Sequence, residues 1–232
     1  MIEIFEGKLG GGKTYSAVER ILLALANGQT VYTNIELVPH AITLYLRAVY
    51  GVELQQDQLN FLTYQNIPTF HKYCKWGTPD CPTLLVLDEV HLWFNARDWA
   101  NAMKEVLDFL TQSRKASLDI IFISQAAENI DKQFRRLVQY IWRFRDMSRL
   151  QIPVLGIRWP LNQILQIGYD YDGKTKQFQR FCMKDKRIFA CYNTMSFLSP
   201  IEQQERLAKR KMVKVTFWQR MQAHWKFMIG KV

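Results

Sequence analysis

A glycine-rich motif near the N-terminus is the part of the chain whose residue types and spacing point most clearly to chemistry. Residues 7–14 read Gly-Lys-Leu-Gly-Gly-Gly-Lys-Thr and match G-x-x-x-x-G-K-[ST] at every fixed position. In such a loop backbone N–H groups surround phosphate oxygens, Lys13 reaches the β- and γ-phosphates, and Thr14 places its hydroxyl on Mg²⁺. The alternative is a glycine-rich turn that binds nothing. We predict that ATP and Mg²⁺ bind here, through Gly7, Lys8, Gly10, Gly11, Gly12, Lys13, Thr14 and Tyr15.

Two adjacent acids supply the second half of a candidate site. Residues 84–87 read Leu-Leu-Val-Leu, and Asp88 and Glu89 follow directly. A buried strand would deliver both acids to its carboxyl end beside the glycine-rich loop. There Asp88 would join Thr14 in holding Mg²⁺, and Glu89 would orient a water in line with the γ-phosphate. The alternative is a solvated turn; we predict Asp88 as a metal ligand and Glu89 as catalytic.

Two further catalytic candidates rest on position alone. Gln125 follows the apolar run 119–124, where it would lie between the acids and the γ-phosphate and sense it; the alternative is a simple strand exit. Hydrolysis also calls for a positive charge on the transferred phosphate. Arg114, Arg135 and Arg136 flank this strand, and each could equally be a surface cation. We select Arg114 as the arginine that enters a neighbouring subunit.

The elements that must position these residues alternate between strand and helix. Because such alternation is typical of a parallel sheet covered on both faces, we predict an α/β fold of the P-loop NTPase type. The tandem acids and the strand before Gln125 favour its ASCE class, which has an additional strand and a catalytic glutamate. Residues 51–82 look irregular. Apolar runs predict strands at 2–5, 30–33, 83–87, 119–124 and 140–144. Helical spacing of apolar residues predicts helices over 15–27, 40–50, 99–113 and 131–138. Three further short strands, at 163–171, 176–183 and 187–192, would form an antiparallel extension of the sheet.

Length and charge suggest how the chain is organised. Its 232 residues suffice for one α/β domain, which we place at 1–200 with residues 151–195 as the antiparallel extension. No signal-peptide pattern and no run of 18 apolar residues is present, so we expect the chain as given not to span a membrane. Its four cysteines are expected to be reduced. The net charge of +10 is concentrated in residues 206–232, which hold eight basic residues and no acid.

The basic tail, residues 201–232, has the pattern of an amphipathic helix. Trp218, Met221 and Trp225 would share one face, with lysines and arginines beside or opposite them. Such a helix suits the surface of an anionic membrane, where each basic residue contributes up to about 1 kcal/mol. The alternatives are a helix docked on its own domain and a contact to nucleic-acid phosphates. We favour the membrane.

The chain resembles the filamentous-phage assembly ATPases, the gene I product and zonula occludens toxin-like proteins. The resemblance is strongest over about residues 1–160. It implies an ATP-hydrolysing motor at the cytoplasmic face of the host inner membrane that drives phage assembly and export. Its implied partners are a homo-oligomeric ring, phage coat protein, phage single-stranded DNA or its packaging complex, and secretion-pore proteins. The matching segments are 7–14, 84–89, 93–99 (Trp-Phe-Asn-Ala-Arg-Asp-Trp), 114–115, 119–122, Gln125, 131–133 and 187–194.

Two alternatives to this function remain open at the level of sequence. A DNA-translocating motor of the FtsK–HerA type predicts ATPase activity that DNA stimulates strongly and lipid does not affect. A nucleotide-dependent membrane switch of the Min/Par type is suggested by Lys8, because those proteins carry an extra lysine early in the loop. That switch predicts Lys8→Ala to be as damaging as Lys13→Ala.

Overall fold

The computed structural model describes residues 1–94, 102–149 and 161–193. Within these ranges the strands form one sheet in the order β3-β2-β4-β5-β1-β6-β7-β8. All neighbours from β3 to β6 pair in parallel, whereas β6, β7 and β8 pair antiparallel. The strands are β1 Ile2–Glu6, β2 Val31–Thr33, β3 Leu59–Phe61, β4 Thr83–Leu87, β5 Leu118–Ser124, β6 Tyr140–Asp146, β7 Gln163–Asp170 and β8 Lys176–Met183.

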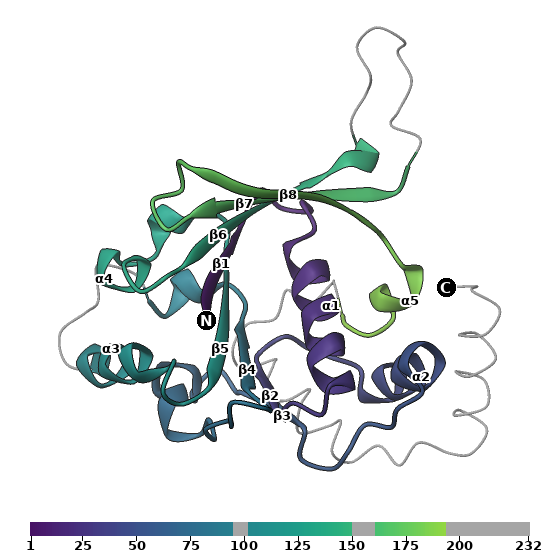
Figure 1. Ribbon diagram of the computed structural model, residues 1–232, viewed down its shortest axis with the longest axis horizontal. Helices are drawn as coiled ribbons and strands as arrows, with labels where there is room; N and C mark the ends of the chain where they lie inside the picture. Colours follow the sequence, from purple (N-terminus) through teal and green to yellow (C-terminus); the bar gives the residue numbers. More distant parts are fainter. Residues whose placement is uncertain (95–101, 150–160, 194–232) are drawn as a thin grey trace, which may run out of the picture.

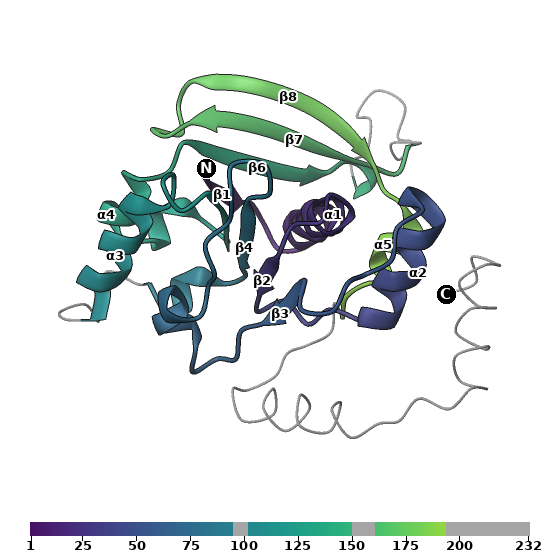
Figure 2. The ribbon, with the colours of Figure 1, turned by 60° about the horizontal axis from the view of Figure 1, so that its bottom comes forward.

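Helices cover both faces of the parallel part of the sheet. Helices α1, α2 and α5 lie on one face and α3 and α4 on the other, and β7 and β8 curve over α1 (Figures 1 and 2). The α-helices are α1 Lys13–Ala26, α2 Pro39–Tyr50, α3 Ala102–Gln112, α4 Lys132–Arg135 and α5 Lys186–Phe189, and short 3-10 turns occupy Ile67–Lys72, Val90–Leu92, Ala127–Asn129 and Met147–Arg149. Among the described residues, no helix is long and apolar enough to cross a lipid bilayer.

The nearly unbroken apolar sequences of β1 and β4 fit their positions in the interior of the sheet. All residues of β1 and β4 are buried, because helices pack on both faces of these strands. The apolar side chains divide into two core clusters, one under α1 and α2 and the other under α3 and α4. The predicted α/β fold is confirmed. Strand β5 lies between β1 and β4, as the additional strand of the ASCE class requires.

Two predictions of local structure were wrong. Residues 187–192 do not form a strand; Asp185 accepts a hydrogen bond from the Arg187 N–H (2.8 Å) and starts the helix α5, after which Tyr192 bridges Leu37. The stretch 51–82 is not wholly irregular, because it contains β3 and a 3-10 turn. Such a short edge strand leaves little periodic signal. The tail 201–232 and its predicted helix lie outside the described residues.

Candidate nucleotide-binding site

The glycine-rich loop joins β1 to α1 and approaches the backbone of β6 closely. Gly7 has a φ of +148°, and a Cβ at this position would lie 2.9 Å from the carbonyl oxygen of Phe144. Gly12, at the start of α1, has a φ of +102°, and its Cβ would meet the side chain of Ile164 on β7. Glycine is therefore required both by the backbone conformation and by the space available.

This close approach predicts that Gly7→Ala weakens both folding and ATP binding. Gly28→Ala is the matched control: Gly28 also has a positive φ (+79°), but no atom lies within 4 Å of its Cβ position. We expect Gly28→Ala to cost about 1 kcal/mol of stability from backbone strain alone. Gly7→Ala should cost more, because Phe144 must move, and only Gly7→Ala should weaken ATP binding. Thermal unfolding and ATP titration of both variants measure this; equal effects would contradict the packing argument.

Hydrogen bonds tie the functional side chains of the loop to the carboxyl end of β4. The ammonium of Lys13 donates to the carbonyl oxygen of Gly7 (2.8 Å), and the hydroxyl of Thr14 donates to Oδ2 of Asp88 (3.1 Å). Asn34, directly after β2, fixes the Asp88 backbone: its Nδ2 donates to the Asp88 carbonyl (3.0 Å) and its Oδ1 accepts from the Asp88 N–H (2.7 Å). The sequence analysis did not predict this positioning role, because Asn34 belongs to no motif and lies far from Asp88 in the sequence.

Burial perturbs the charged groups of the site. It raises the pKa of Asp88 to about 6, with a further contribution from the neighbouring carboxylate of Glu89, although hydrogen bonds from Glu89 N–H and Thr14 act in the opposite direction. Burial also lowers the pKa of Lys13, against the attraction of both acids. Several buried ionisable groups with shifted pKa values in one region are characteristic of functional sites, including sites that bind charged ligands.

Glu89 is held in an unusual backbone conformation. Its φ is +50°, in the left-handed region that residues with a side chain rarely adopt. Its Oε2 lies 3.3 Å from Nδ1 of His91, close enough for an ion pair but without hydrogen-bond geometry. Backbone strain of this kind persists where the surrounding structure fixes it, often at functional sites. In this conformation Glu89 lines the cavity beside the glycine-rich loop.

A cavity of about 500 Å³ lies between the loop and the antiparallel part of the sheet. One wall is formed by residues 9–15 with Asp88 and Glu89. The sequence did not predict that the opposite wall belongs to the site, although three of its residues lie in the family-matching segment 187–194, because its residues are distant in sequence from the loop. It consists of Asp146, Ile164, Lys184, Phe189, Tyr192 and Asn193.

A buried ion pair stabilises this second wall. Nζ of Lys184 lies 2.7 Å from Oδ1 of Asp146, and the two side chains are only 9% and 12% exposed. We expect Lys184→Met to lower the free energy of unfolding by about 2 kcal/mol, because the buried carboxylate of Asp146 loses its ion pair with the Lys184 ammonium. Urea unfolding measures this. The double variant with Asp146→Asn should lose less than Lys184→Met alone, and a loss in the single variant below about 0.5 kcal/mol would contradict a stabilising pair.

Gln125 and Arg114 do not join this cavity. Gln125 is exposed and contributes to a second cavity of about 780 Å³ behind the loop, beside Arg143 and Arg145. Arg114 is exposed near the start of β5, so the seven residues of that strand, roughly 20 Å, separate it from the phosphate loop. Within one subunit Arg114 therefore cannot reach the site, and its role in a neighbouring subunit stays a prediction. Arg135 and Arg136 lie at the end of α4.

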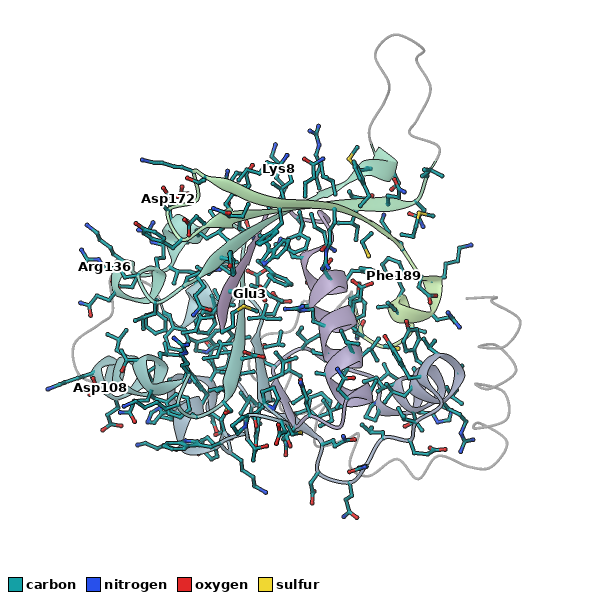
Figure 3. All side chains as sticks on the ribbon, viewed as in Figure 1. Glu3, Lys8, Asp108, Arg136, Asp172 and Phe189 are labelled. Carbon is teal, nitrogen blue, oxygen red and sulfur yellow. The ribbon has the colours of Figure 1, made fainter. Side chains whose placement is uncertain are left out.

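Lys8 and Tyr15 occupy different environments. The side chain of Lys8 is exposed at the outer surface (Figure 3), and only its carbonyl oxygen meets Lys13 Nζ, at 3.3 Å. Tyr15 is buried, and its hydroxyl accepts a hydrogen bond from the Asp185 N–H at 2.7 Å. Tyr15 therefore links the start of α1 to the segment that leads into α5.

The additional strand, the glycine-rich loop and the tandem acids define a P-loop NTPase of the ASCE class. Two solved structures share this fold. One is the N-terminal domain of zonular occludens toxin from Neisseria meningitidis (TM-score 0.52, 15% identity, 83% of this chain and 98% of that one). The other is the genome packaging NTPase B204 of Sulfolobus turreted icosahedral virus 2 (TM-score 0.50, 17% identity, 77% and 96%).

The chain belongs to the zonular occludens toxin (Zot) family, which it matches over residues 1–160. It is 34% identical over 163 residues to the Gene 1 protein of Salmonella phage IKe, covering 67% of this chain and 43% of that protein. It is 27% identical over 217 residues to the Gene 1 protein of Escherichia phage If1, covering 85% and 59%. The chain thus spans about half the length of these relatives. The resemblance inferred from the sequence is confirmed.

Proposed function

We propose that the chain hydrolyses ATP and powers the assembly and export of a filamentous phage at the cytoplasmic face of the host inner membrane. The observation that carries the proposal is the convergence of Lys13, Thr14, Asp88 and Glu89 on one cavity in a member of the Zot family. The named relatives support the phage context, because they are Gene 1 proteins of phages IKe and If1.

The residues of the cavity divide the chemistry among them. Lys13, which now donates to loop carbonyls, would turn its ammonium to the β- and γ-phosphates. The hydroxyl of Thr14 and the carboxylate of Asp88, 3.1 Å apart, are hard oxygen donors that fit Mg²⁺, and this ion would neutralise phosphate charge. Glu89 would hold the attacking water and orient it toward the γ-phosphate.

The position of Arg114 supports a ring of subunits. Charge that develops on the transferred phosphate requires a cation, and an arginine from a neighbouring subunit commonly supplies it. Arg114 is exposed and lies shortly before β5, toward the amino ends of the parallel strands and opposite to its own phosphate loop, where a neighbouring copy can approach it. Gln125 follows the strand between β1 and β4 but lines the second cavity, so its role in sensing the γ-phosphate stays a prediction. In this arrangement ATP turnover depends on contact between subunits.

The remaining partners follow from the family and the basic tail. Residues 206–232 would bind anionic lipid, and coat protein, phage single-stranded DNA with its packaging complex and secretion-pore proteins would be the partners in export.

The test of this function is particle release by a phage whose gene carries Glu89→Gln. We expect phage DNA and coat protein to accumulate in the cells while released particles fall by at least a hundredfold. Glu128→Gln, at an exposed acid beyond β5, is the matched control and should release particles normally. Release by Glu89→Gln at the wild-type level would contradict the proposal.

A further inference from the structure

Phe189 exposes an apolar ring inside the nucleotide cavity. Its side chain is 40% exposed, whereas its neighbours Ile188, Cys191 and Tyr192 are buried. An exposed phenylalanine forgoes part of the roughly 1.5–3 kcal/mol that full burial would contribute. Phe189 lies on the cavity wall opposite the phosphate loop, on α5 and facing α1 (Figure 3). Its ring contacts the rings of Tyr15 and Tyr192, with centroid distances of 5.0 and 6.2 Å, and its exposed part is available to a ligand that occupies the cavity.

The position of Phe189 relative to the glycine-rich loop determines which part of a bound nucleotide would contact the Phe189 ring. Asp88 and Glu89 mark the γ-phosphate end, and the loop amides that end at Thr14 hold the α- and β-phosphates. The nucleoside then extends past Tyr15, away from the acids. The rings of Tyr15 and Phe189 have centroids 5.0 Å apart, so the nucleoside end of the cavity is the end where Phe189 lies.

The segment that carries Phe189 is fixed on both sides. Before it, the N–H of Asp185 donates to the hydroxyl of Tyr15 (2.7 Å). After it, the carbonyl of Cys191 accepts from Val38 N–H (2.8 Å), and the N–H of Asn193 donates to the carbonyl of Glu36 (3.0 Å). A ring whose backbone is held on both sides is preorganised, so binding a ligand against it costs little conformational entropy.

We propose that Phe189 is the surface on which the nucleobase stacks. This inference rests on the proposed function and adds the base subsite to it. Every base has a flat π-face, and stacking on an aromatic side chain contributes about 1–3 kcal/mol per base. The residues that line this end of the cavity, Phe189, Tyr192 and Asn193, come from a segment that is distant in sequence from the glycine-rich loop. The helix α5, which follows the antiparallel strands, would thus take part directly in binding nucleotide.

The experiment compares ATP with inorganic tripolyphosphate, which has the same three phosphates and no base. We expect Phe189→Ala to weaken ATP binding about 5- to 150-fold and to leave tripolyphosphate binding unchanged, since only the base loses its contact. Phe189→Trp should restore ATP binding. Phe181→Ala is the matched control, because Phe181 is 49% exposed on β8 and lies outside the cavity; it should bind both ligands as the wild type does.

Each other outcome is decisive. Unchanged ATP binding by Phe189→Ala, or equal loss of ATP and tripolyphosphate, overturns the stacking role; equal loss would show that Phe189 only supports the fold. If the wild type and Lys13→Ala bind ATP equally, or the wild type binds none, the proposed function fails and the base subsite fails with it. Retained ATP binding by the wild type with an insensitive Phe189 overturns the base subsite alone.

Discussion

Glu89→Gln is expected to lower ATP turnover about 10²- to 10⁴-fold while ATP affinity changes by less than about threefold. The amide has almost the size of the carboxylate, so the strained backbone at Glu89 and its place on the cavity wall can persist. It lacks the negative charge that orients and activates water. The loss should therefore appear in kcat and not in binding. Phosphate release under saturating ATP, together with ATP titration, measures the two effects separately.

The Glu128→Gln control tests whether removing any acid near the glycine-rich loop lowers ATP turnover. Glu128 is exposed and contributes to the second cavity behind the phosphate loop. Its variant should keep wild-type turnover. If Glu89→Gln retains more than about a tenth of wild-type turnover, Glu89 is not the residue that orients the water, and the assignment of roles in the cavity is wrong.

Lys13→Ala is expected to weaken ATP binding by at least about a hundredfold. The variant removes the ammonium that donates to the Gly7 carbonyl and that we expect to pair with the β- and γ-phosphates, and loss of one partner from a buried charge pair costs about 2–5 kcal/mol. Lys8→Ala should have a much smaller effect, because only the carbonyl of Lys8 faces the loop and its side chain is exposed. Calorimetric titration with ATP compares the two.

The contrast between the two lysines also separates the motor from a membrane switch. Equal damage by Lys8→Ala and Lys13→Ala would contradict this account and favour a Min/Par-type dimer. The sheet order already argues against that class, because β5 lies between β1 and β4 as in the additional-strand class.

The sequence predicted those parts of the site that lie in contiguous motifs. The residues from Gly7 to Thr14 and the run that ends at Asp88 and Glu89 each specify a local structure, and a parallel sheet brings their ends to one edge. The strands β4 and β5 were predicted closely for the same reason, since long apolar runs are strong signals.

The second wall of the cavity could not be predicted in this way. Its ion pair joins Asp146 to Lys184, and its exposed ring comes from Phe189, so their meeting depends on how β7 and β8 curve over α1. Local signals also competed there. The unbroken apolar run 188–192 favoured a strand at 187–192, whereas the capping hydrogen bond of Asp185 produced a helix.

The measurement that tests the central claim most directly is phosphate release from ATP by the wild-type chain over a wide range of protein concentrations. We predict that turnover per subunit rises steeply with concentration, because each site is completed by a neighbouring subunit, and that it disappears in Glu89→Gln. Turnover that is absent at every concentration, that stays constant with concentration, or that survives in Glu89→Gln would contradict a motor whose sites are completed between subunits.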